Sequence, residues 1–86
     1  MVALDHMLRN VEKLMVEIGT RLARVRKSRG LTRKRLSEIS GISDETIRQI
    51  ENNGGLPNVK TLCKICGALG IKAEEVIPEE MYEVKR

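Results

Sequence analysis

The sequence has no tryptophan or phenylalanine, and Tyr82 is its only aromatic residue. Its core must therefore be aliphatic, built from Ile, Leu, Val, Met and Cys side chains. Two cysteines and one histidine in 86 residues are also too few for a disulfide framework or a tetrahedral zinc site. The length suits one small domain with a single core.

Long apolar runs are also missing, since no stretch approaches the roughly 20 consecutive apolar residues of a membrane span. The first residues lack a signal-peptide pattern, so we expect a cytoplasmic protein without a membrane partner. We find no nucleophile beside a base, no glycine-rich phosphate loop and no metal cluster. The adjacent acids Asp44 and Glu45 diverge by about 100° on a helix and cannot share a substrate. We therefore expect no enzyme, no catalytic residue, no cofactor and no metal.

Charge is unevenly distributed along the chain. Residues 21–35 contain eight Lys or Arg and no acid, whereas the rest of the chain carries eight basic and twelve acidic residues. A basic patch on an acidic body is the electrostatic footprint of a phosphate partner, most simply nucleic acid.

The first seventeen residues predict an amphipathic helix, with apolar side chains at spacings of three and four. This stripe continues through Ile18, Leu22 and Val25, which allows one long helix to Ser28, but a mid-helix glycine at Gly19 favours a break or bend. The helix would either pair with a second copy of the chain or cover its own core. We divide the chain into this helix (1–17), a domain (18–77) and a polar tail (78–86).

The central stretch, residues 31–53, reads as two short helices joined by a tight turn. Thr32 and Ser43 are placed to cap the two helix starts, and Gly41 supplies a positive φ in the turn between them. A further helix begins after Asn58, and Pro78 prevents extension of a last short turn. The predicted core positions of these helices are Leu36, Ile47, Ile50, Val59, Leu62, Ile65, Cys66 and Leu69.

Arg33, Lys34 and Arg35 occupy the first turn of their helix, where the macrodipole favours acids. They form either a solvated basic face or, as we favour, a surface that faces an external phosphate. Cys63 and Cys66 are predicted to be packing residues, with a redox role as a weaker alternative. His6 is predicted to lie at the surface or in an interface.

With its helices laid out, the chain resembles the Cro/repressor, or Xre-type, family of lambda-repressor-like helix-turn-helix proteins. The resemblance rests on IGTRLARVRKSRGLT, LSEISGISDETIRQIE and LPNVKTLCKICGALGIKAEEVI, in order and without gaps. It implies an all-α, compact five-helix DNA-binding domain, to which this chain adds the N-terminal amphipathic helix.

The resemblance also implies roles for individual residues. Base reading in the major groove is expected of the outward residues of the third helix, and Arg26 with Glu51 matches a structural salt bridge. The base-reading set is Asp44, Glu45, Arg48 and Gln49. The phosphate-contacting set is Arg29, Thr32, Arg33, Lys34, Arg35, Ser43 and Thr46.

Some positions depart from the family pattern. Asp44 and Glu45 are acidic where relatives are polar or basic. They either accept a hydrogen bond from the amino group of cytosine or only stabilise the start of the helix. Asn53, Gly54 and Gly55 replace a basic loop, and Ile39 is apolar where relatives are often charged. Ile39 would be partly exposed or would meet something that this domain does not contain.

These observations predict a sequence-specific DNA-binding transcriptional regulator, a repressor that binds a palindromic operator in double-stranded DNA as a homodimer. Residues 1–17 are the expected pairing segment. The alternative is a protein-interaction module, such as an antitoxin or anti-regulator, with secondary or lost DNA binding. The acidic helix tip, the missing loop cations and Ile39 favour this alternative somewhat.

Overall fold

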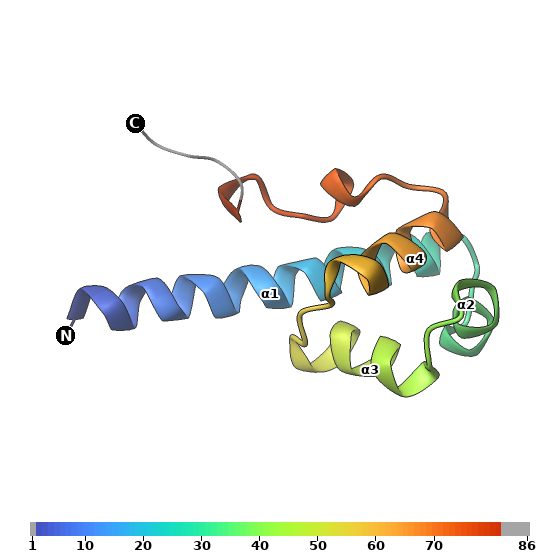
Figure 1. The fold of residues 1–86 in the computed structure, drawn as a ribbon, viewed down its shortest axis with the longest axis horizontal. Helices are drawn as coiled ribbons and strands as arrows, with labels where there is room; N and C mark the ends of the chain where they lie inside the picture. Colours follow the sequence, from blue (N-terminus) through green and yellow to red (C-terminus); the bar gives the residue numbers. More distant parts are fainter. Residues whose placement is uncertain (1, 82–86) are drawn as a thin grey trace.

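The fold is built from helices alone in the part of the chain that the structure describes. The computed structural model describes residues 2–81, with side chains from residue 10 onward. Its elements are α1 (Val2–Ser28), α2 (Arg33–Ser40), α3 (Asp44–Asn53), α4 (Val59–Leu69) and two 3-10 turns, η1 (Ala73–Glu75) and η2 (Glu79–Met81). Figure 1 shows α2, α3 and α4 grouped around the C-terminal half of α1, while its N-terminal half projects beyond them. The predicted all-α class is confirmed.

The expected count of five helices plus a separate N-terminal helix is wrong for these residues. The N-terminal segment is continuous with α1, which crosses the expected boundary between residues 17 and 18 without a break. After α4 there is no fifth α-helix, only the three-residue turns η1 and η2. Pro78 has no N–H with which to continue a helix from η1. The side chains of Leu4, His6, Met7 and Leu8, and the tail from residue 82, lie outside the described residues.

Gly19 does not bend α1, and its neighbours show why it is glycine. A Cβ atom at this position would lie 1.9 Å from the carbonyl oxygen of Ile50 in α3. No side chain fits in that space, so the backbones of α1 and α3 come together only with glycine here. The break that we predicted from helix propensity is overridden by tertiary packing.

The core is aliphatic, as its composition required. It lies where α2, α3 and α4 meet the C-terminal half of α1. Each fully buried Leu or Ile contributes about 1.5–3 kcal/mol of burial free energy. The buried set is Ile18, Leu22, Leu36, Ile47, Ile50, Leu62, Ile65, Cys66, Leu69 and Val76. The prediction of a core position for Val59 is wrong, because this first residue of α4 is 78 % exposed.

Side-chain caps fix where three of the helices begin. The Thr32 hydroxyl accepts a hydrogen bond from the Arg35 amide at 3.0 Å, and the Ser43 hydroxyl accepts one from the Thr46 amide at 3.1 Å. The Asn58 side chain caps α4 in the same way. Gly41, between α2 and α3, has φ 75°, so the predicted caps and the predicted turn are confirmed. None of the described helices is both long and apolar enough to cross a membrane.

Candidate nucleic-acid interface

Helix α3 has one buried face and one exposed polar face. Ile47 and Ile50 are 1 % and 4 % exposed and anchor it to the core. The four residues proposed to read bases, Asp44, Glu45, Arg48 and Gln49, are all exposed. Their positions follow from the helical period, which sets them on the side opposite the two isoleucines.

Asn52 belongs to the same exposed face and is missing from the predicted base-reading set. It is exposed and lies four residues after Arg48, so the two are neighbours on the helix surface. Its amide has the donor and acceptor that adenine requires. Its spacing from Arg48 is the signal in the sequence that identifies it.

Three side chains on this face are joined by hydrogen bonds. Arg48 donates from Nε to Glu45 Oε2 at 3.1 Å, and from Nη2 to Oε1 at 2.6 Å and Oε2 at 2.7 Å. Gln49 donates from Nε2 to Glu45 Oε1 at 3.2 Å. The hydrogen bonds from Arg48 hold the pKa of Glu45 below its usual value, and Glu45 in turn raises the pKa of Arg48. Both groups are therefore charged at neutral pH.

Helix α2 begins with Arg33, Lys34 and Arg35 and has no acid in its first turn. Lys34 and Arg35 are exposed, and the contact of Arg35 with Glu38 is long, at 3.9 Å. Such an exposed pair contributes little to stability. Two cationic side chains therefore remain accessible beside the positive end of the helix dipole.

Arg33 is tied into a buried ion network. The Glu51 side chain is only 2 % exposed and accepts hydrogen bonds from Arg26 Nε at 2.7 Å and from Arg33 Nε at 2.9 Å. Arg26 also donates from Nη1 to the carbonyl of Leu31 at 2.7 Å. Burial raises the pKa of Glu51, but the hydrogen bonds from Arg26 and Arg33 outweigh it and the pKa lies below its ordinary value. The network joins α1, α2 and α3. Arg33 contributes its Nε to it, and the Arg33 side chain is 35 % exposed.

The other residues proposed to contact phosphate also have structural partners. Arg29 donates from Nε to the carbonyl of Leu69, the last residue of α4, at 2.9 Å. Ser43 donates its hydroxyl proton to Thr46 Oγ1 at 2.8 Å, while the hydroxyls of Thr32 and Thr46 keep a proton that a phosphate oxygen could accept. The caps thus leave donors at the starts of both α2 and α3.

The two cysteines and Ile39 lie outside the exposed face of α3. Cys66 is buried, and burial raises the pKa of its thiol, which disfavours the reactive thiolate; Cys63 is exposed. No group of three or more His, Cys, Asp or Glu side chains suited to a metal ion occurs among the described residues. Ile39 on α2 is 46 % exposed, which agrees with the expectation that this side chain would be partly exposed.

A short capped helix α2, a glycine turn and a polar-faced helix α3 seated on a common core together define a helix-turn-helix module. Residues 22–76 match the family model described as helix-turn-helix. This segment covers more than half of the chain and includes α2, α3 and α4.

Individual relatives support the same assignment. The chain is 35% identical over 63 residues to the immunity repressor protein of Bacillus phage phi105, covering 73% of this chain and 44% of that protein. It is 38% identical over 61 residues to the HTH-type transcriptional regulator SutR of Escherichia coli, covering 71% of this chain and 34% of SutR. It thus spans less than half of these two relatives. A HTH-type transcriptional regulator of Sinorhizobium fredii, y4dJ, is 32% identical over 60 residues, which are 70% of this chain and 78% of that protein.

A solved structure has the same fold. The restriction-modification controller protein C.AhdI from Aeromonas hydrophila superposes with a TM-score of 0.69 at 26% identity, over 72% of this chain and 94% of that one. The chain belongs to the Xre-type helix-turn-helix family.

Proposed function

We propose that this chain is a sequence-specific DNA-binding transcriptional regulator that represses by occupying a palindromic operator as a homodimer. The observation that carries the proposal is the exposed polar face of α3, held outward by the burial of Ile47 and Ile50. A helix placed in this way fits the major groove, where base edges present distinguishable donor and acceptor patterns. Double-stranded DNA is the proposed partner of this chain. We propose no catalytic role for the protein and a cytoplasmic location.

Affinity for the DNA backbone is assigned to α2 and its surroundings. Lys34 and Arg35 are exposed at a helix start that carries no acid, so a phosphate there meets both cations and free backbone N–H groups. Neutralised phosphates release counterions and make binding depend on salt. Thr32, Ser43 and Thr46, with the outer atoms of Arg29 and Arg33, would orient the protein on the backbone.

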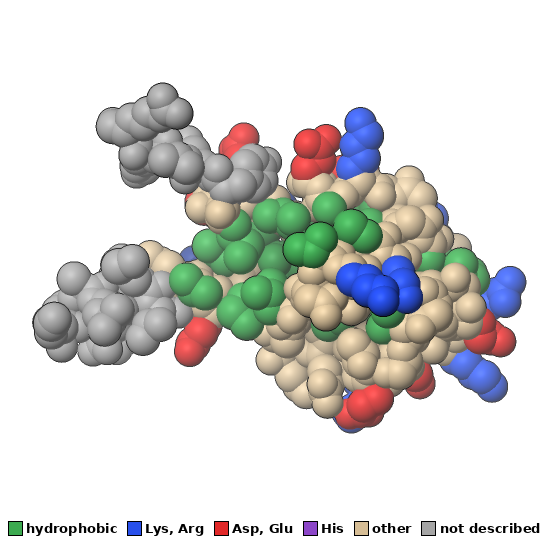
Figure 2. All heavy atoms as spheres, viewed as in Figure 1, with side chains coloured by type: hydrophobic (Ala, Val, Ile, Leu, Met, Phe, Trp, Pro, Cys, Tyr) green, Lys and Arg blue, Asp and Glu red, His purple; other side chains and the backbone are tan. Residues whose placement is uncertain are grey.

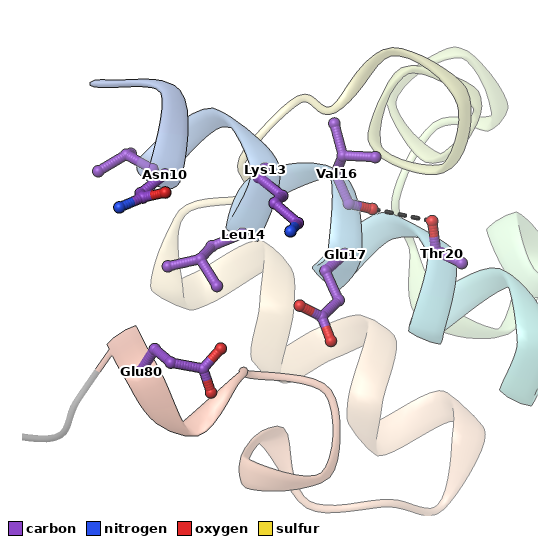
Figure 3. Close-up of a pocket in the computed structure, with 8 residues that line it drawn as sticks. Asn10, Lys13, Leu14, Val16, Glu17, Thr20 and Glu80 are labelled. Atoms are coloured by element: carbon purple, nitrogen blue, oxygen red, sulfur yellow. Dashed lines mark hydrogen bonds between the residues drawn. The ribbon is translucent and has the colours of Figure 1, made fainter. Parts of the chain in front are cut away.

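Pairing of two copies is assigned to the projecting half of α1. Val11 is 47 % exposed, although it lies seven residues before Ile18 and therefore on the same side of the helix as the core stripe. Together with Leu14 it lines an open hollow between α1 and η2, and Glu80 of η2 lines the opposite side (Figure 3). Figure 2 shows hydrophobic side chains gathered where α1 approaches the C-terminal turns. Residues 1–17 contain the proposed pairing segment, and the recognition helices of a dimer would need a spacing of about 34 Å.

The DNA-binding proposal is tested by fluorescence anisotropy with a random duplex over a series of salt concentrations. Each phosphate contact contributes about 0.9 to the slope of log K against log salt. Replacing Lys34 and Arg35 by Ala should therefore lower the slope by up to about 2. The matched control replaces Lys60 and Lys64, two exposed cations on α4, and should change the slope much less. Undetectable binding of the wild-type chain, or equal slopes for the two variants, would contradict the proposal.

The pairing proposal is tested by light scattering. Val11→Lys places a charge on the apolar side of α1 and should yield a monomer, whereas Glu12→Lys, at an exposed position that does not line the hollow, should leave the mass unchanged. Equal masses for the wild type and Val11→Lys would exclude this part of α1 as the pairing surface.

The protein-interaction alternative is not favoured by the relatives, which are named as repressors and transcriptional regulators. The exposed Ile39, the acidic start of α3 and the absence of basic residues at positions 53–55 are the observations on its side. Substitution of Ile39 by Glu would leave DNA affinity unchanged if that side chain serves only a protein contact.

A further inference from the structure

Glu45 lies at the centre of the exposed face of α3, but its carboxylate is already engaged. It accepts three hydrogen bonds from Arg48 and one from Gln49, at 2.6–3.2 Å. A carboxylate offers about four lone-pair directions, so little accepting capacity remains for the amino group of a cytosine. Direct base reading by Glu45 would require this cluster to be dismantled.

The contacts of Arg48 use one edge of its guanidinium group. Its Nε and Nη2 atoms face Glu45, which leaves the edge formed by Nη1 and the second proton of Nη2. That remaining edge is a pair of parallel N–H donors, the geometry that matches the O6 and N7 acceptors of guanine. The carboxylate also fixes the plane of the guanidinium, so less side-chain freedom is lost when it contacts a base.

Gln49 is oriented by the same carboxylate. Its Nε2 donates to Glu45 Oε1 at 3.2 Å, and this decides which end of the amide carries the acceptor. An amide whose orientation is fixed presents one donor and acceptor order to a base, whereas a free amide can flip and present either. Glu45 thus acts on both candidate base-reading neighbours.

We propose that Glu45 determines the base preference of α3 as a positioning residue, holding Arg48 so that its free edge selects guanine, and does not itself contact a base. This inference rests on the proposed function, since it concerns the selectivity of a DNA-binding surface. This positioning role also explains why an acid occupies the exposed face of α3, which stabilisation of the helix start does not explain. By neutralising Arg48 locally, Glu45 reduces its attraction for any phosphate while preserving its attraction for guanine.

The experiment compares binding-site selection from a random duplex pool by the wild type, Glu45→Gln and Glu38→Gln. Glu38 is an exposed acid on α2 with a long ion contact to Arg35, at 3.9 Å, so its substitution removes the same charge without touching Arg48. For the preferred site, affinity is then measured against the same site with the guanine pair replaced. The discrimination should fall about tenfold in Glu45→Gln, the order expected for a good bidentate contact. It should stay at the wild-type level in Glu38→Gln, and affinity of Glu45→Gln for random duplex should not fall.

A double-mutant cycle shows whether Glu45 acts through Arg48. If it does, Glu45→Gln should cause no further loss of guanine discrimination in an Arg48→Ala background. A wild-type preference for cytosine that disappears in Glu45→Gln, with guanine selection intact, would show direct reading and overturn the inference. Unchanged discrimination in Glu45→Gln would overturn it as well, while the proposed function would stand. A wild-type chain that binds no duplex would overturn the proposed function and this inference together.

Discussion

Replacing Glu51 by Gln should come close to unfolding the protein, although the substitution preserves shape. The Glu51 side chain is 2 % exposed and its partner Arg26 is 7 % exposed, so the variant leaves a buried guanidinium without a counter-charge. Removing one partner of a buried pair costs about 3–5 kcal/mol. At about 0.05–0.15 kcal/mol per residue, the whole chain has a stability of only roughly 4–13 kcal/mol. The loss is therefore a large part of the total.

The assay is urea denaturation followed by far-UV circular dichroism, with thermal melts as a second measure. One kcal/mol shifts the melting temperature of a domain this size by about 4–8 °C, so Glu51→Gln should melt more than 10 °C lower by this scale. Arg33→Gln is the matched control, because it also removes a contact to Glu51 but at a site where the arginine is 35 % exposed. Its cost should be about 1 kcal/mol or less.

A double variant separates the buried charge from the lost contact. Arg26→Met with Glu51→Leu removes both charges and should recover part of the stability, but not all, since the Leu31 carbonyl loses its donor. A denaturation midpoint for Glu51→Gln no lower than that of Arg33→Gln would refute the reasoning. A double variant less stable than Glu51→Gln alone would refute the role assigned to the unpaired charge.

Three further predictions concern the fold. Because the folded pKa of Glu51 lies below its ordinary value, its contribution is complete above about pH 4.3 and is lost as the pH falls through the folded pKa; thermal melts in acid should show this loss in the wild type and not in Glu51→Gln. Gly19→Ala should destabilise the protein in urea denaturation, since its Cβ would clash with the Ile50 carbonyl, whereas Gly67→Ala on α4, with nothing within 4 Å, should stabilise it by about 0.5–1 kcal/mol; the opposite order would contradict the close approach of α1 and α3. Ser43→Ala should cost about 1 kcal/mol in the same assay, and no change would show that the cap contributes nothing.

Local features were predictable from the sequence because their causes are local. Thr32, Ser43 and Asn58 cap helices through hydrogen bonds to amides three residues away, and such bonds depend on chain spacing alone. Most core residues followed from helical periodicity for the same reason, but Val59 is exposed and Val76 is buried because the packing of the chain ends of α4 and η1 depends on the tertiary arrangement. The continuity of α1 at Gly19 did not follow, because it depends on a backbone in α3 that lies far away in the sequence.

The interface was predictable in position but not in its contacts. Spacing placed Glu45, Arg48 and Gln49 on one outward face, yet the choice of partners within that face depends on side-chain rotamers that a helical period does not specify. The bond from Arg33 to Glu51 joins α2 to α3 and needed the tertiary arrangement. Asn52 could have been found from spacing alone.

The close packing of α3 against α1 affects how the sequences of proteins with this fold can change. The residues that hold α3, namely Gly19, Ile47, Ile50 and Glu51, are separate from those on its outer face. Substitutions at Glu45, Arg48, Gln49 or Asn52 therefore leave the packing intact, and substitutions at the residues that hold α3 are selected for stability alone. Under the proposed function, gene duplication followed by drift on the outer face would yield regulators with new operators on an unchanged scaffold, and this chain would be a suitable host for exchanging the sequence of α3.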